Sequence, residues 1–298
     1  MNFLFKTDKK PKLHEISVEK VTGKYGSDEG DFKSPQTVVI DPLNDRIHVA
    51  DLINSRIQVF SLGLEFLFSF PSPSSGSHFL YPYGICIVET LVFVTASSTD
   101  YLKNDLGQGL FIYTTDGVFV ADFLNRIVYK EDMTLKSPQG IAADTNNTVY
   151  IADYGNDRVI ELHNDLSLFK VLLYTPGPHD VKIYQSKLYV LSDDCQVKIL
   201  CLEDQSFLKT IRVSLPTFQR KILTEFFEVS DIGLFISNRK SNKICFMSHE
   251  GELIKELGED SMCSHIKGVA MINCDRMVNV CEKDSGRLKL LKLSSNKI

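Results

Sequence analysis

Two features are missing from this chain of 298 residues: long apolar stretches and an excess of basic residues. A membrane-spanning helix needs roughly 18 or more apolar residues in a row, and no segment approaches that length. The 33 Lys and Arg are outnumbered by 38 Asp and Glu, which gives a formal net charge of -5. Because phosphate binding depends on clustered Lys and Arg, this balance argues against a surface devoted mainly to polyanions and leaves only a local basic patch to consider.

Signals for export, disulfide frameworks and zinc sites are also missing. The opening MNFLF is followed at once by charged residues, without the apolar run and small-residue cleavage site of a signal peptide. The 7 cysteines are odd in number and show no Cys-x-x-Cys spacing, so they indicate neither a disulfide framework nor a zinc ribbon. We therefore expect a cytoplasmic protein in a reducing setting, with no membrane association.

No catalytic motif is recognisable either. The spacing of Ser, His and Asp suggests no triad, and no glycine-rich phosphate loop occurs. Adjacent carboxylates such as Asp193 and Asp194 are of the type that binds calcium or performs acid-base chemistry, but an adjacent pair alternates in direction along a strand and is typical of a polar turn. The residues therefore predict a protein that is not an enzyme and that needs no cofactor.

What the chain does contain is an internal repeat. Residues 137–169 and residues 34–68 align without forcing: both begin with Ser-Pro-Gln, continue to an Ala-Asp pair, and then carry Asn-x-Arg followed by Val or Ile. Self-similarity at a fixed period is the sequence signature of repeat architectures. Length alone would suggest about two domains. The repeat instead favours one domain built from several similar units.

Each repeat divides into four short strands separated by turn residues, and four hairpin-connected strands describe a propeller blade. The last repeat has only three strands, so we expect residues 14–26 to supply its fourth strand and close the ring, which removes exposed strand edges. We predict a solvated tail over residues 1–13 and a single monomeric, all-β, six-bladed propeller over residues 14–298. The predicted blades cover residues 34–71, 81–124, 137–174, 177–213, 222–258 and 266–293.

The motifs P-x-G-I/V-A-x-D, I/V-x-V/I-A-D and N-x-R-I/V resemble those of the NHL-repeat β-propeller family, as found in proteins of the tripartite-motif type. This resemblance implies a binding platform for a protein or peptide, associated with ubiquitin ligases. The chain departs from those ligases because it has no RING finger, B-box or coiled-coil heptad before the propeller. Some family members bind single-stranded RNA, and a relative of the fold is a zinc lyase, so RNA binding and a metal-dependent lyase or hydrolase are the alternatives.

In such a blade the first strand lines the central channel, and its start lies on the same face as the loop between the second and third strands. An insertion at 97–109 lies in that loop of blade two, and such loops often belong to the working face. Non-repeated aromatic residues on a polar surface are good interface anchors. The residues that we predict to bind a partner are Gln36, Tyr83, Tyr101, Gln139, Tyr154, His179 and Lys267, with Arg220, Lys221 or Thr224 at the matching place in blade five.

The repeated polar residues have a structural interpretation, because a feature repeated in separate blades builds the blade more often than it builds one site. Asp and Asn side chains satisfy turn backbone, and Arg binds a carboxylate nearby. This interpretation applies to Asp51, Asn54, Arg56, Asp153, Asn156 and Arg158.

Two alternatives rest on other residues. RNA binding would use a basic sector made of Arg220, Lys221, Arg239, Lys240 and Lys243, together with Lys267 and Tyr83, by backbone contacts and stacking. Metal binding would use His78, His179 and His265, which precede or begin first strands in alternate blades. Their unequal offsets from the matched glycine place them at different heights, so we predict no metal site there.

Overall fold

The structure is a computed structural model, and it describes residues 13–72, 74–75, 78–97, 108–122, 134–163, 169–194, 196–213, 225–238, 241–257, 265–272, 277–282 and 285–295. Within these ranges nearly all regular structure is β-strand, and the one helical element is a 3-10 turn, η2 (Tyr154–Asn156). None of the described helical structure is long and apolar enough to cross a membrane.

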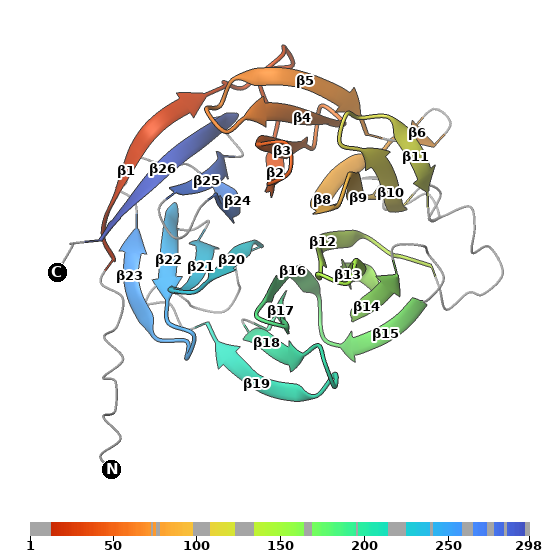
Figure 1. The fold of residues 1–298 in the computed structure, drawn as a ribbon, viewed down its shortest axis with the longest axis vertical. Coiled ribbons are helices and arrows are strands. Elements are labelled where there is room, and N and C mark those ends of the chain that lie inside the picture. The colour runs from red at the N-terminus through yellow and green to blue at the C-terminus, as the bar shows by residue number, and fades with distance from the viewer. Residues whose placement is uncertain are drawn as a thin grey trace.

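The described strands form six four-stranded antiparallel sheets arranged around a central axis (Figure 1). This confirms the predicted all-β, six-bladed propeller. Blades one to three comprise β2 (Pro35–Asp41), β3 (Arg46–Asp51), β4 (Arg56–Ser61) and β5 (Phe66–Pro71); β8 (Tyr81–Val88), β9 (Leu91–Ser97), β10 (Gly109–Thr114) and β11 (Phe119–Asp122); and β12 (Pro138–Ala143), β13 (Thr148–Asp153), β14 (Arg158–His163) and β15 (Phe169–Tyr174). A short pair, β6 (Ser74–Ser75) and β7 (His78–Phe79), stands between the first two blades.

The remaining blades follow the same plan. Blade four comprises β16 (Pro178–Tyr184), β17 (Lys187–Ser192), β18 (Gln196–Cys201) and β19 (Phe207–Arg212), and blade five comprises β20 (Phe227–Ser230), β21 (Gly233–Asn238), β22 (Lys243–Met247) and β23 (Leu253–Leu257). Blade six comprises β24 (Ile266–Met271), β25 (Met277–Glu282), β26 (Arg287–Ser295) and, from the start of the chain, β1 (Leu13–Thr22).

The two ends of the chain close the ring. β1 pairs antiparallel with β26, with Val18 opposite Leu291, so blade six has the strand order β1-β26-β25-β24 (Figure 1). The prediction that a strand from the start of the chain completes the last blade is confirmed. Because the outer strand of blade six comes from the opposite end of the chain, folding of that blade requires both ends together.

The hydrophobic core lies between blades rather than at the axis. Six clusters of buried side chains are found among the described residues, and each joins one blade to the next, including the junction of blade six with blade one through Leu288 and Phe32. In the cluster between blades five and six, the rings of Phe235 and Phe246 stack with centroids 4.9 Å apart. Burial of each such side chain is worth about 1.5 to 3 kcal/mol, so neighbouring blades stabilise one another.

Glycine follows the start of the first strand where inner strands come close. A Cβ at Gly140 would lie 2.3 Å from Asp180 Oδ1, and one at Gly268 would lie 2.7 Å from the carbonyl oxygen of Gln36. Both contacts cross from one blade to the next around the channel. In blades two, three and six, glycine at this position therefore permits a close approach between neighbouring inner strands.

The repeated Asp, Asn and Arg side chains hold blades one and three together, as predicted. The Asp153 carboxylate accepts hydrogen bonds from Arg158 Nε at 2.7 Å, Asn156 Nδ2 at 2.8 Å and the backbone N–H of Lys136 at 2.7 Å. Burial raises the pKa of the Asp153 carboxyl, and these hydrogen bonds oppose the shift. The matching contacts in blade one are made by Asp51, Arg56, Asn54 and Lys33.

Candidate binding site at the channel mouth

The starts of the first strands bring one side chain from every blade to a cavity of about 500 Å³ at one end of the channel. Five of the six were predicted from the sequence, and the sixth is Glu225. The full lining is Ser34, Gln36, Leu52, Ile53, Tyr81, Tyr83, Gln139, His179, Glu225 and Lys267.

A repeated backbone feature aims these side chains. The residue two places before the cavity residue has a left-handed backbone in four blades, with φ of 59° at Ser34, 45° at Ser137, 45° at Gly177 and 46° at His265. In the first three of these, a proline follows and begins the inner strand. A left-handed residue turns the chain sharply, and proline then fixes the extended direction. The Ser-Pro-Gln sequence therefore positions glutamine at the channel mouth.

His179 is the most constrained side chain of the cavity. Its Nδ1 lies 2.9 Å from Gln139 Oε1 and its Nε2 lies 2.6 Å from Asp193 Oδ1. The Tyr154 hydroxyl donates to the other Asp193 oxygen at 3.2 Å, and the Tyr154 ring packs against the imidazole with centroids 5.0 Å apart. Blades three and four thus hold His179 in one orientation, and Tyr154 acts behind it instead of lining the cavity.

The charges at the mouth are paired. Lys267 is 4% exposed, forms an ion pair with Glu225 and lies 5.8 Å from the centroid of the Phe226 ring. The imidazole of His179 likewise lies against the Asp193 carboxylate. Amides, paired charges and the aromatic Tyr83 therefore make a polar wall with little net charge, and the half-exposed Ile53 adds an apolar edge.

Glu225 was missed because blade five lacks the motif that marks the other blades. Residues 225–227 are Glu-Phe-Phe, with neither a proline nor a glycine, whereas the first strand of each other blade begins with at least one of the two. The sequence prediction of Arg220, Lys221 or Thr224 at this place falls outside the described residues. The member of blade five that lines the cavity is Glu225, which reverses the sign of the charge that Arg220 or Lys221 would bring.

A second group of charges lies farther along the inner strands. Lys182 Nζ is 3.7 Å from Asp180 and 4.0 Å from Glu228, so it bridges blades four and five. Burial raises the pKa of the Glu228 carboxyl to about 6, against the attraction of Lys182. Asp180 also accepts a hydrogen bond from the backbone N–H of Phe227 at 3.3 Å. These groups tie the two blades together and could be found only from the fold.

The other predicted site residues are distributed as follows. Lys243 lies 4.0 Å from Glu256, and Lys267 is buried in its ion pair, so neither presents a bare charge to a phosphate. His265 does not line the cavity with His179, and the described residues contain no group of three or more His, Cys, Asp or Glu suited to a metal. The predictions for Tyr101, Arg220, Lys221, Arg239, Lys240, the His78 side chain and insertion residues 98–107 lie outside the described residues.

Fold and cavity together define a β-propeller with a polar cavity at one end of its channel. Residues 135–161 match the NHL repeat, which covers the inner three strands of blade three. The chain is therefore a propeller that contains an NHL repeat, consistent with the NHL-repeat propeller family, and this fold is commonly a scaffold for protein interactions. No curated protein matches the chain by sequence.

Solved structures similar to this one include propellers from several settings. A chain of a nidogen/laminin complex has a TM-score of 0.64 at 16% identity, covering 80% of this chain and 85% of that one. Virginiamycin B lyase from Staphylococcus aureus has a TM-score of 0.62 at 11% identity, covering 94% and 100%. An auxiliary nutrient binding protein from Bacteroides thetaiotaomicron has a TM-score of 0.64 at 11% identity, covering 92% and 72%. At these identities the likeness establishes the fold alone.

Proposed function

We propose that this chain is a non-enzymatic scaffold that recognises a protein or peptide through the face bearing the channel mouth. The observation that supports this most is the convergence of one side chain from each of the six blades on a single cavity of about 500 Å³. Cavities lined by aromatic groups and a few fixed polar groups are the usual sites of recognition. A propeller in the nidogen/laminin complex offers an example of this fold in a complex.

The wall chemistry limits the partner. Because Lys267 and His179 are paired with carboxylates, the mouth offers little net attraction to a polyanion. Gln36 and Gln139 offer amide hydrogen bonds, and Tyr83 offers a flat aromatic surface. We expect an extended polar segment of a partner protein whose backbone bonds the amides and whose one apolar side chain packs on the tyrosine.

The wider role that we propose follows from the NHL resemblance. In the proteins that this chain resembles, such propellers recognise substrates for ubiquitin ligases, and we propose the same class of role, with the catalytic part supplied by a partner. We also propose that the protein works as a monomer in the cytoplasm. Cys86 and Cys245 are buried free thiols, which suits a reducing compartment.

Capture of partners from cells tests the proposal. The test variant combines Tyr83→Ala with Gln139→Ala, and the control is Asn146→Ala, an exposed side chain in the turn at the other end of blade three. We expect a set of proteins recovered with wild type and Asn146→Ala, and lost with the double variant at matched expression. Recovery of the same proteins with all three would refute recognition at the mouth.

The insertion in blade two has its own test. β9 ends at Ser97 and β10 begins at Gly109, so residues 98–107 stand in sequence between the second and third strands of blade two. We propose that this insertion contributes to recognition on the face of the channel mouth. Deleting residues 98–107 and joining the ends with a short glycine and serine linker should weaken recovery of the same partners. Unchanged recovery with a folded deletion variant would limit recognition to the cavity.

A further inference from the structure

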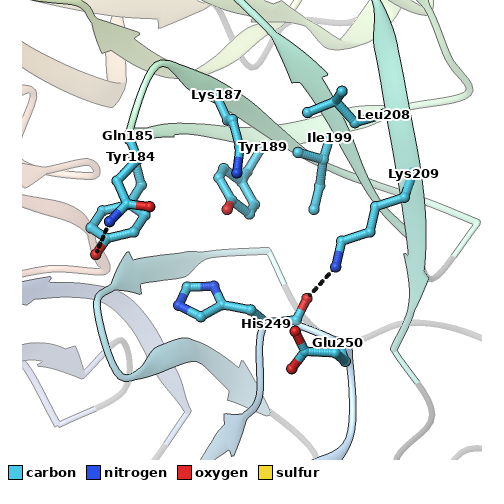
Figure 2. Close-up of a pocket in the computed structure, with 9 residues that line it drawn as sticks. All are labelled: Tyr184, Gln185, Lys187, Tyr189, Ile199, Leu208, Lys209, His249 and Glu250. Atoms are coloured by element: carbon cyan, nitrogen blue, oxygen red, sulfur yellow. Dashed lines mark hydrogen bonds between the residues drawn. The ribbon is translucent and has the colours of Figure 1, made fainter. Parts of the chain in front are cut away.

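A second cavity, of about 430 Å³, lies between blades four and five (Figure 2). It stands at the Tyr184–Lys187 end of the β16–β17 pair, whereas the channel mouth stands at the Pro178–Ser192 end. One wall is the turn between β16 and β17, where Gln185 and Ser186 both have left-handed φ. The other wall is the turn between β22 and β23, closed by hydrogen bonds between Ser248 and the residues after it. Both turns are tight hairpin connections, so the walls are fixed before any ligand arrives.

The strand register aims a row of side chains from blade four toward this cavity. Lys187 and Tyr189 are two residues apart on β17, and therefore share one face of the sheet. Tyr189 lies opposite Ile199 on β18, and Ile199 lies opposite Lys209 on β19. Tyr189 and Ile199 also belong to the core cluster between blades four and five, and His249 and Glu250 of the turn form the facing wall of the cavity.

Blade three has a tyrosine at the same position as Tyr189, and there the hydroxyl has a hydrogen-bond partner. Tyr150 stands at the place of Tyr189, and both side chains are 4% exposed. The Tyr150 hydroxyl donates to Asp144 Oδ2 at 3.3 Å. Next to it, Glu161 accepts a hydrogen bond from Gln205 Nε2 of blade four at 2.8 Å. Two carboxylates of blade three, Asp144 and Glu161, thus accept hydrogen bonds from the polar side chains beside them.

Blade four has lost both carboxylates. Ile199 stands at the place of Glu161, and the two-residue turn at 185–186 replaces the turn that holds Asp144. Among the described residues, neither the Tyr189 hydroxyl nor the Lys187 ammonium has a hydrogen-bond or ion-pair partner, and the same is true of the His249 ring nitrogens. This cavity therefore presents donors that lack an acceptor.

The other side chains that line the cavity include two rings against which a planar ligand group could pack. The rings of Tyr184 and His249 are nearly parallel, with centroids 5.8 Å apart and an interplanar angle of 15°. Lys209 donates to the His249 carbonyl oxygen at 2.8 Å, which fastens the turn of blade five to the outer strand of blade four (Figure 2). Glu250 is the one carboxylate of the lining, and it bonds neither Lys187 nor Tyr189. The lining thus carries two lysines against one carboxylate.

We propose that this cavity binds a small organic anion, with its carboxylate or phosphate held by Lys187 and Tyr189 and its planar body against Tyr184 and His249. The volume suits a ligand of that size. The Glu250 charge acts on the Tyr189 hydroxyl, whose pKa is raised by burial and by Tyr184 and Glu250, so this carboxylate opposes the bound anion. This site is separate from the channel mouth and does not depend on the proposed recognition of a protein partner.

Calorimetric titration with phenyl phosphate, benzoate, inorganic phosphate and benzyl alcohol tests the site. We expect saturable binding of phenyl phosphate or benzoate at one site per chain, weaker binding of inorganic phosphate, and none of benzyl alcohol. The stronger of the two aromatic probes identifies the preferred anionic group. Absence of saturable binding by both aromatic anions, or equal binding of benzyl alcohol, would overturn the proposal.

Variants locate the binding. Lys187→Gln and Tyr189→Phe should each lower the affinity for the aromatic anion on the order of tenfold, because each removes a hydrogen-bond donor to a charged acceptor. Glu250→Gln should raise the affinity for the aromatic anion. Tyr150→Phe in blade three is the matched control, and it should leave this affinity unchanged. Thermal melts of each variant verify folding. Equal affinity in Lys187→Gln, Tyr189→Phe and Tyr150→Phe would contradict this location.

Discussion

Blades three and four have the same strand plan, yet they treat their polar groups in opposite ways. In blade three the Asp153 carboxylate binds Arg158, and Asp144 accepts from the Tyr150 hydroxyl. In blade four Ser192 stands at the place of Asp153, and the Tyr189 hydroxyl faces a cavity. In blade three, which keeps the repeat, these polar side chains bond one another. In blade four, which departs from it, the Tyr189 hydroxyl is available to bond another molecule.

The largest expected difference between these blades is at the matched positions Asp153 and Ser192. Asp153→Ala should cost about 3 to 5 kcal/mol of unfolding free energy, because it leaves the buried Arg158 charge without its partner. Ser192→Ala removes only neutral or weakly held hydrogen bonds and should cost about 1 kcal/mol. Urea unfolding of both variants measures the difference. Equal costs would show that the ion pair does not hold blade three together.

In blade one, the position that matches Tyr150 and Tyr189 holds a histidine, His48, which is fully buried. Burial lowers the pKa of His48 from 6.5 to about 4. The unfolded chain therefore binds a proton more readily, and stability should fall as the pH drops from 6.5 to 4, by roughly 3 kcal/mol in total.

The variant His48→Leu isolates this effect. Because it has no titrating ring, its stability should decline less steeply than that of the wild type between pH 6.5 and pH 4, when both are followed by urea unfolding at a series of pH values. Parallel pH profiles for the two proteins would contradict burial of neutral His48.

The smallest expected effect compares the two tyrosines directly. Tyr150→Phe should cost about 1 kcal/mol, since it removes the hydrogen bond to Asp144. Tyr189→Phe should leave stability nearly unchanged, because its hydroxyl has no hydrogen-bond partner among the described residues. Thermal melts of the two variants side by side make the comparison. A larger loss for Tyr189→Phe would show that this hydroxyl is already satisfied within the protein.

Most of the fold was predictable because its determinants are local. Where they occur, the left-handed residue, the proline and the glycine at the start of an inner strand act through backbone geometry, so Pro138 and Gly140 mark blade three in the sequence alone. The closing strand followed by counting, since blade six had three strands and the segment before blade one had no other place.

The site was predictable only where those marks persist. Gln36, Tyr83, Gln139, His179 and Lys267 were found by their distance from the motif, but Glu225 was not, because blade five has lost it. The cavity between blades four and five could not be found at all. It depends on how far the turn at 248–251 reaches across to Lys187 and Tyr189, which is set by packing between blades.

Recognition of a partner at the channel mouth is the central claim, and site-specific photo-crosslinking in cells tests it most directly. A photoreactive phenylalanine would replace Tyr83 at the mouth and, as the control, Tyr174, which is 73% exposed on the outer strand of blade three. We predict discrete cross-linked protein adducts from position 83 and none from position 174. Adducts from position 174 alone, or the same adducts from both positions, would contradict recognition at the mouth.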